Sequence, residues 1–210
     1  MSEMSMNKVI HAAFRRDLDR FIDALTAFPP GDLTRAKQLG TAWKNFEFEL
    51  TYHHEGEHSI AWPALEQIGV SRDLLATMDE EHAVMGAALV DAGEAMKALT
   101  RTAGVAESRA AAVAFKKLRE VTVTHLDHEE AELESVYLQN EDAPAVKEMA
   151  RKFAKVSPAR GGRFMAWLMD GATPAEREVL TSNVPGPVLA VLTGVFGRSY
   201  KRNVASVWQG

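Results

Sequence analysis

The chain has 210 residues, enough for one large domain, and its 46% hydrophobic and 25% charged residues are typical of a globular protein. A formal net charge of −5 argues against nucleic acid as the main partner. The absence of cysteine excludes disulfides, thiolate nucleophiles and cysteine-bound metal centres. It also fits a reducing compartment, and the N-terminus lacks an apolar signal region, so we expect a cytoplasmic protein. The longest apolar stretch, 184–197, is too short for a membrane span.

Helical periodicity dominates the first 140 residues. The pattern predicts four long helices, at about 4–28, 32–68, 71–104 and 105–140. Prolines 29 and 30 end the first helix, while Asp32 and Ser71 are suitable N-caps for the second and third. Long helices joined by short turns predict an all-α fold, an antiparallel up-and-down four-helix bundle.

Residues 141–210 differ from the bundle in composition, because proline and glycine become frequent. The pattern there predicts shorter helices, at about 143–156, 158–169, 174–183 and 188–207. Thr173 and Glu176 form a capping-box signal at the start of one of them. This segment carries ten Lys and Arg against six Asp and Glu, and several aromatic residues. We therefore divide the chain into a bundle, 1–140, and a helical extension, 141–210, which packs on the bundle.

Each long helix of the predicted bundle places a histidine on its otherwise apolar face. On the second and fourth helices a glutamate follows one turn later on the same face. The residues concerned are His11, His53, Glu57, His82, His125 and Glu129. Burying carboxylates without a partner is costly, and a pair of divalent cations would remove that cost.

The residue types of this cluster restrict the metal. Imidazole combined with carboxylate suits iron, manganese or zinc, whereas calcium and magnesium prefer oxygen ligands alone. A structural zinc site needs four ligands, fewer than this cluster offers. Sites of carboxylate and histidine inside four-helix bundles hold di-iron or di-manganese centres.

The same residues carry a resemblance to a known family. Residues 4–140 resemble the hemerythrin-like proteins, or HHE cation-binding domains, through His11, HHEGEHSIAWPAL in the second helix, MDEEHAVM in the third and HLDHEEAEL in the fourth. The order and spacing of these motifs make the resemblance specific. The aromatic extension is loosely similar to that of actinobacterial members.

The resemblance implies an oxygen-bridged, non-haem di-iron centre, with manganese as the less favoured metal, that binds dioxygen or reacts with peroxide or nitric oxide. The six residues above match ligand positions of the family. His54 stands where members have either glutamate or histidine, so it joins them as a seventh ligand. Met78 stands where oxygen-carrying hemerythrins have a further histidine. That departure argues against reversible oxygen carriage.

Other polar residues near the motifs have two interpretations each. His58 is either a substitute ligand or a histidine that lies behind the ligands or in solvent, and we favour the second interpretation. His128 is expected to be exposed or behind a ligand. Tyr52 either donates to a bound peroxide, serves as a ligand or only packs, and we favour packing. Glu81 and Glu130 either bond to ligand imidazoles or are solvated.

The sequence supports two functional hypotheses. The first is a di-iron protein that binds or turns over a small oxidant in oxidative or nitrosative stress, with catalase-like or nitric-oxide-related activity as an open question. The second is an iron or oxygen sensor, in which metal loading controls a protein partner bound through residues 141–210.

Overall fold

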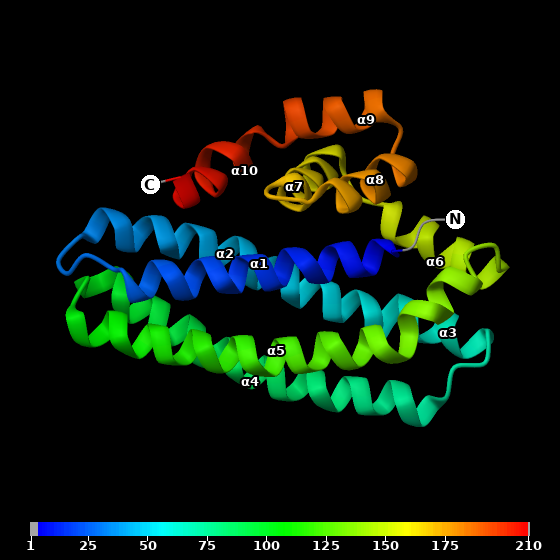
Figure 1. Cartoon of the computed structure of the whole chain (residues 1–210), viewed down its shortest axis with the longest axis horizontal. Helices are drawn as coiled ribbons and strands as arrows, with labels where there is room; N and C mark the ends of the chain where they lie inside the picture. The colour runs from blue at the N-terminus through cyan, green and yellow to red at the C-terminus, as the bar shows by residue number, and fades with distance from the viewer. Residues whose placement is uncertain (1–3, 210) are drawn as a thin grey trace.

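The computed structural model describes residues 4–209, and in this part of the chain the backbone forms helices and turns without any strand. Four long antiparallel helices make a bundle (Figure 1). They are α1 (Met6–Thr26), α2 (Leu33–Gly56), α4 (Arg72–Thr102) and α5 (Val105–Gln139). The all-α bundle predicted from periodicity is confirmed. Residues 1–3 and 210, at the outer ends of the two predicted parts, lie outside the described residues.

The predicted caps fix where two of these helices begin. The Asp32 side chain accepts a hydrogen bond from the backbone N–H of Arg35 at 2.8 Å. The Ser71 hydroxyl accepts one from the N–H of Asp73 at 3.2 Å. Both side chains satisfy N–H groups that a helix start leaves unpaired, so both cap predictions are confirmed.

The prediction of one continuous helix over 32–68 is wrong. After α2, a single wide π-turn, η1 (Glu57–Ala61), leads into the short helix α3 (Trp62–Gln67). The backbone N–H of Trp62 donates to the carbonyl of Glu57, five residues earlier. Pro63 follows and has no N–H to continue the regular ladder. The motif residue Glu57 therefore stands at the start of a π-turn, a feature that is frequent at functional sites.

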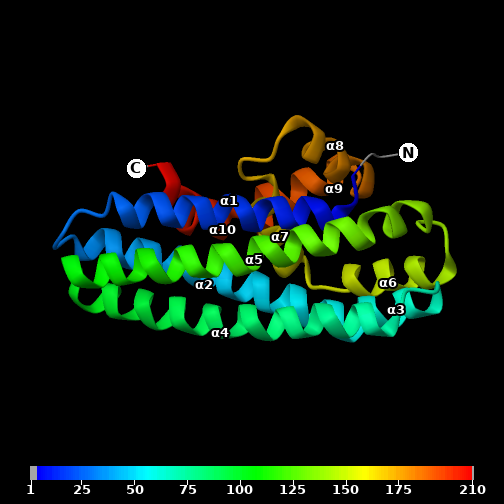
Figure 2. The ribbon, with the colours of Figure 1, turned by 60° about the horizontal axis from the view of Figure 1, so that its bottom comes forward.

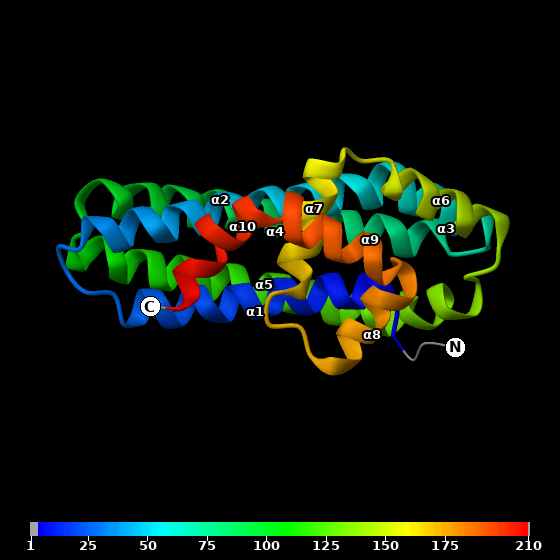
Figure 3. The same ribbon diagram turned by 90° about the horizontal axis from the view of Figure 1, so that it is seen from above.

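The extension forms shorter helices: the first packs on α3 at one end of the bundle, and the later ones lie across one side of it, over α1 and α2 (Figures 1 and 3). They are α6 (Pro144–Ala154), α7 (Pro158–Met169), α8 (Pro174–Asn183), α9 (Gly186–Val191), the π-turn η2 (Leu192–Phe196), α10 (Arg198–Asn203) and the 3₁₀ turn η3 (Ala205–Gln209). The capping box at Thr173 is present. One helix over 188–207 was expected, and this prediction is wrong. The regular helix ends at Val191, and between η2 and α10 the chain passes close to α7, because a β-carbon at Gly197 would lie 2.7 Å from that of Ala166.

The extension shares its core with the bundle. Trp167 of α7 is fully buried against Phe14 of α1, with ring centroids 5.1 Å apart. Its indole N–H donates to Asp17 at 2.7 Å. The Tyr200 hydroxyl donates to Asp170 at 2.9 Å. Figure 2 shows these helices resting against α1 from a second direction. Packing on the bundle is therefore observed, while the domain division at residue 140 stays a prediction.

Two apolar clusters fill the bundle interior, and they are separated along its axis. On α5, Leu126 belongs to the larger cluster and Leu133 to the smaller one. The site residue Glu129 lies between them in sequence, and its side chain is fully buried. A polar layer therefore interrupts the core at this level.

Within residues 4–209, no single helix has both the length and the apolarity needed to cross a membrane. Helix α8 and the α9–η2 segment reach those values only as a pair, which is bent by 108°.

Candidate metal centre

Seven ligand-type side chains converge in the polar layer between the two apolar clusters. They form two groups, and within each group the ligand atoms lie within 4.8 Å of one another. One group is His54, Glu57, His82 and His125, and the other is His11, His53, Glu57 and Glu129. Glu57 belongs to both. The structure thus brings together all seven residues singled out in the sequence.

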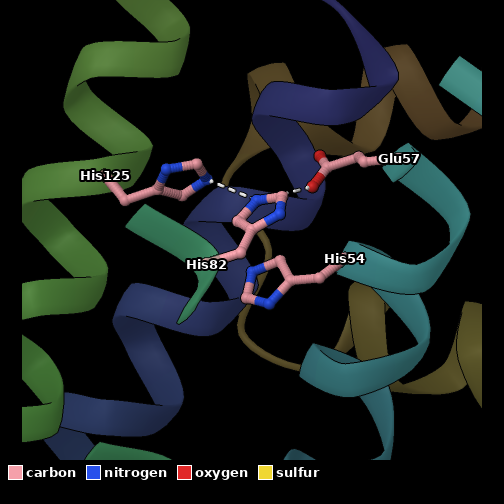
Figure 4. Close-up of side chains that lie close together, drawn as sticks. All are labelled: His54, Glu57, His82 and His125. Carbon is pink, nitrogen blue, oxygen red and sulfur yellow. Dashed lines mark hydrogen bonds and ion pairs between the residues drawn. The ribbon is translucent and has the colours of Figure 1, made fainter. Parts of the chain in front are cut away.

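The first group draws side chains from three segments of the chain (Figure 4). His54 of α2 stacks on His82 of α4, with ring centroids 4.1 Å apart. The Nε2 atoms of His82 and His125 face each other at 3.1 Å. Glu57 adds a carboxylate, with Oε2 3.3 Å from Nε2 of His82. Three imidazoles and one carboxylate therefore point at one small volume.

The second group contains fewer imidazoles and more carboxylate. Nε2 of His11 lies 3.3 Å from Oε2 of Glu129, and Nε2 of His53 lies 3.0 Å from Oε1 of Glu57. Asn7, one turn before His11, donates to Oε1 of Glu129 at 2.9 Å. The two oxygens of Glu57 thus face different groups.

Several buried polar atoms of the layer lie close to one another but form no hydrogen bond of normal geometry within the described residues. They are Nε2 of His53 and of His54, both carboxylate oxygens of Glu57, and Oε2 of Glu129. Buried polar groups are normally paired, and a cluster of unpaired ligand atoms is an arrangement that cations satisfy. The residues present therefore fit a pair of metal ions.

Carboxylates behind the histidines set which ring nitrogen faces the centre. Nδ1 of His11 donates to Glu130 at 3.0 Å, and Nδ1 of His125 donates to Glu81 at 2.8 Å. Nδ1 of His82 lies 3.6 Å from Asp79. Such partners orient a metal-binding imidazole and increase its basicity. In each case Nε2 is left to face inward.

The electrostatics of the layer keep Glu57 and Glu81 charged. Burial alone would raise the pKa of Glu57, but the histidines beside it, His53 first, hold that pKa well below its usual range. Burial also acts to raise the pKa of Glu81, but the imidazoles of His125 and His128 outweigh this effect and lower that pKa below its usual value. An ionised Glu57 is the form that binds cations.

The pKa values of three imidazoles are shifted, two of them downward and one upward. Burial and the neighbouring His82 lower the pKa of His54 and of His125, so both are neutral and able to coordinate. Burial also opposes charge on His11, but Glu129 and Glu130 outweigh it and raise the pKa of His11 to about 9. Its position therefore attracts positive charge, and a bound cation would replace the proton.

The family model of the hemerythrin HHE cation binding domain matches residues 7–137. This match spans more than half of the chain and contains all seven converging residues. The chain belongs to the hemerythrin family. It therefore has a cation-binding domain, and the two groups of histidine and glutamate are its metal-binding candidates. No curated protein and no solved structure matches the chain.

The structure also places the uncertain residues of this hemerythrin-family protein. His58 is 73% exposed and its Nδ1 pairs with Asp79, so it lies outside the centre. His128 is half-buried and bonds to Glu81. Tyr52 is exposed and stacks on Phe48, so its phenol packs on the surface.

Sequence reasoning missed two residues of the layer in this family member. Asp79 accepts a hydrogen bond from the Trp62 indole at 2.9 Å and pairs with His58. Asn7 bonds to Glu129. Their positions one turn from His82 and His11 carried a signal, because residues three or four apart share a helix face.

Proposed function

We propose that the protein is a non-haem di-iron protein that binds or reacts with a small oxidant: dioxygen, hydrogen peroxide or nitric oxide. The observation that carries the proposal is the position of Glu57 in both ligand groups. A carboxylate whose two oxygens face different groups is suited to bridging two cations. When bound, an iron pair supplies the electrons and the Lewis acidity that such oxidants require.

The side chains around the centre have separate tasks in this proposal. Glu81 and Glu130 hold the imidazoles of His125 and His11 with Nε2 inward. Glu57 and Glu129 supply negative charge, which favours the higher oxidation state of a metal. Fully buried apolar residues close the interior on the side of the larger cluster and exclude water; they include Phe14, Leu50 and Leu118.

Ligand types favour iron but are shared by manganese. The test is metal analysis of the purified protein together with its visible spectrum. We expect two irons per chain and absorption that changes on adding azide, peroxide or nitric oxide. A protein that is purified with one zinc per chain, or that binds no iron on reconstitution, would contradict the proposal.

A second candidate function is an iron or oxygen sensor, and one structural observation favours it. Ring contacts run from the centre to the extension: His53 lies 5.3 Å from Phe14, and Phe14 lies 5.1 Å from Trp167 of α7. A change at the centre therefore has a packed route to α7. The sensor predicts that iron loading alters amide hydrogen exchange in α7–α10, and equal exchange with and without iron would contradict it.

A further inference from the structure

One buried hydroxyl lies on the stripe of α5 that also carries two residues of the centre. Thr122 of α5 is completely buried, and its Oγ1 has no hydrogen-bond partner among residues 4–209. The other unpartnered atoms of the polar layer are ligand atoms of histidine and glutamate. Thr122 is not a ligand-type residue, so its unpaired hydroxyl calls for a separate explanation.

Helical threonines elsewhere in the chain show what Thr122 would ordinarily do. A buried or exposed helix threonine can donate to the carbonyl one turn earlier. Thr124, two residues along the same helix, donates to Glu120 at 2.9 Å, and Thr193 donates to Leu189 at 2.9 Å. Thr26, Thr41, Thr77 and Thr181 do the same. The hydroxyl of Thr122 forms no such bond, although burial makes an unpaired hydroxyl expensive.

Helix geometry places Thr122 beside the centre. It belongs to the buried stripe of α5 that continues with His125 and Glu129. At about 100° per residue, Thr122 and Glu129 point within about 20° of each other, and His125 lies one turn, about 5 Å, from Thr122 along the axis. Side chains in a helix lean toward its N-terminus, so those of His125 and Glu129 extend toward the level of Thr122.

Apolar side chains lie before Thr122 on this stripe and next to His53 on α1. Leu118, one turn before Thr122, is fully buried, as is Phe14 of α1, whose ring packs against His53. Phe14 also contacts Phe46 at a centroid distance of 5.8 Å. On α5 the hydroxyl therefore stands between the apolar Leu118 and the ligand residues His125 and Glu129, of which Glu129 belongs to the group of His11, His53, Glu57 and Glu129. That group has the fewer imidazoles of the two, and it adjoins Phe14.

From these observations we infer that the Thr122 hydroxyl is the hydrogen-bond donor for a small anionic ligand, of the azide or hydroperoxide type, held at this group. The inference rests on the proposed function, because it needs an exogenous ligand at the centre. Thr122 is then a ligand-recognising residue that the metal-ligand motifs do not include. It adds a directional polar contact to a pocket wall that is otherwise apolar.

The first test measures azide affinity of the iron-loaded full chain by visible titration. Hydrogen bonds to charged groups contribute enough that Thr122→Val should weaken azide binding about tenfold or more. Thr122→Ser keeps the hydroxyl and should stay within about threefold of the wild type. Thr124→Val, an exposed neighbour with a bonded hydroxyl, is the control and should leave azide binding unchanged. Equal affinity of Thr122→Val and wild type would overturn the inference.

The second test needs no metal. If the hydroxyl is unpaired, Thr122→Val should raise the melting temperature of the metal-free protein, because the change removes a buried polar group without a partner. A lower melting temperature would show that the hydroxyl has a structural partner and would overturn the inference. Failure of the proposed function can be told apart from failure of this inference, because the wild-type protein would then hold no iron or show no response to azide. Failure of this inference appears only in the Thr122 variants.

Discussion

At the scale of single residues, each inward-facing histidine of α1, α4 and α5 has a carboxylate behind it. Glu130 stands behind His11, and Glu81 behind His125. The sequence motifs reveal the seven converging residues because a histidine or a glutamate on an apolar helix face is conspicuous. The outer carboxylates are not conspicuous, because most helix glutamates are solvated and only the packing of neighbouring helices shows which ones bond to histidine.

The shared position of Glu57 predicts a loss at both ligand groups when it is changed. Glu57→Gln keeps the shape of the side chain, but a neutral amide neutralises less charge and bridges two cations poorly. We expect iron to be lost from both ligand groups, while the helicity measured by circular dichroism stays the same. Glu55→Gln, an exposed change in the last turn of α2, is the control and should retain full iron. Full iron in Glu57→Gln would rule out a bridging role.

The outer carboxylate Glu81 is predicted to act through the imidazole that it orients. It accepts hydrogen bonds from His125 at 2.8 Å and from His128 at 2.7 Å. Glu81→Gln should weaken metal binding about 10- to 100-fold, as loss of such a partner commonly does. Competition with a chelator measures this change. Glu80→Gln, its exposed neighbour, should bind as the wild type does, and a similar loss in both variants would point to general charge instead.

At the scale of secondary structure elements, periodicity predicted the long helices because each buries one apolar stripe. It did not predict the π-turn at Glu57–Ala61 or the breaks after Val191. Pro63 follows the first interruption, and Gly194 and Gly197 lie in or directly after the second, but neither signal fixes where the chain turns. The second also depends on the close approach of Gly162 to η2, a tertiary contact that local sequence does not encode.

The pair of glycines in α7 gives a test of that close approach. A β-carbon at Gly162 would lie 2.6 Å from the backbone oxygen of Leu192, whereas one at Gly161 would meet only Val156, at 3.5 Å. Gly162→Ala should lower the free energy of unfolding by about 1–3 kcal/mol, the usual cost of overpacking. Gly161→Ala should be neutral or stabilising, because alanine favours helix more than glycine does. Urea unfolding compares the two, and equal stability would contradict the packing of α7 on η2.

At the scale of the whole molecule, the extension and the bundle are joined by partly buried polar contacts as well as by apolar packing. Arg20 of α1 pairs with Asp170 at 2.9 Å, and Asp170 also accepts from the Tyr200 hydroxyl. The aromatic residues of 141–210 predicted that this segment packs on the bundle. Which helices it covers could not be predicted, because that depends on pairings between residues such as Asp17 and Trp167 that lie 150 positions apart.

The Tyr200 contact predicts how stability depends on alkaline pH. Burial, with Asp17 and Asp170 nearby, raises the pKa of Tyr200 above its usual value of 10.0. The folded state therefore keeps this proton at a pH where the unfolded chain loses it, so stability falls as the pH rises above about 10. Tyr200→Phe should lose about 1 kcal/mol near neutral pH, because the hydrogen bond to Asp170 is gone. Its stability should decline less steeply than that of the wild type between pH 9 and 11, roughly the range spanning the tyrosine pKa.

Unfolding in urea at several pH values measures both effects for Tyr200→Phe. Equal slopes of stability against pH in the two proteins would show that Tyr200 ionises as freely in the folded state as in the unfolded chain.

The central claim is that one layer of the bundle holds two metal ions that share Glu57. Anomalous X-ray scattering at the iron edge from crystals of the iron-loaded protein tests it most directly. We predict two peaks, one among His54, Glu57, His82 and His125, and the other among His11, His53, Glu57 and Glu129. A single peak, or peaks away from these side chains, would contradict the account.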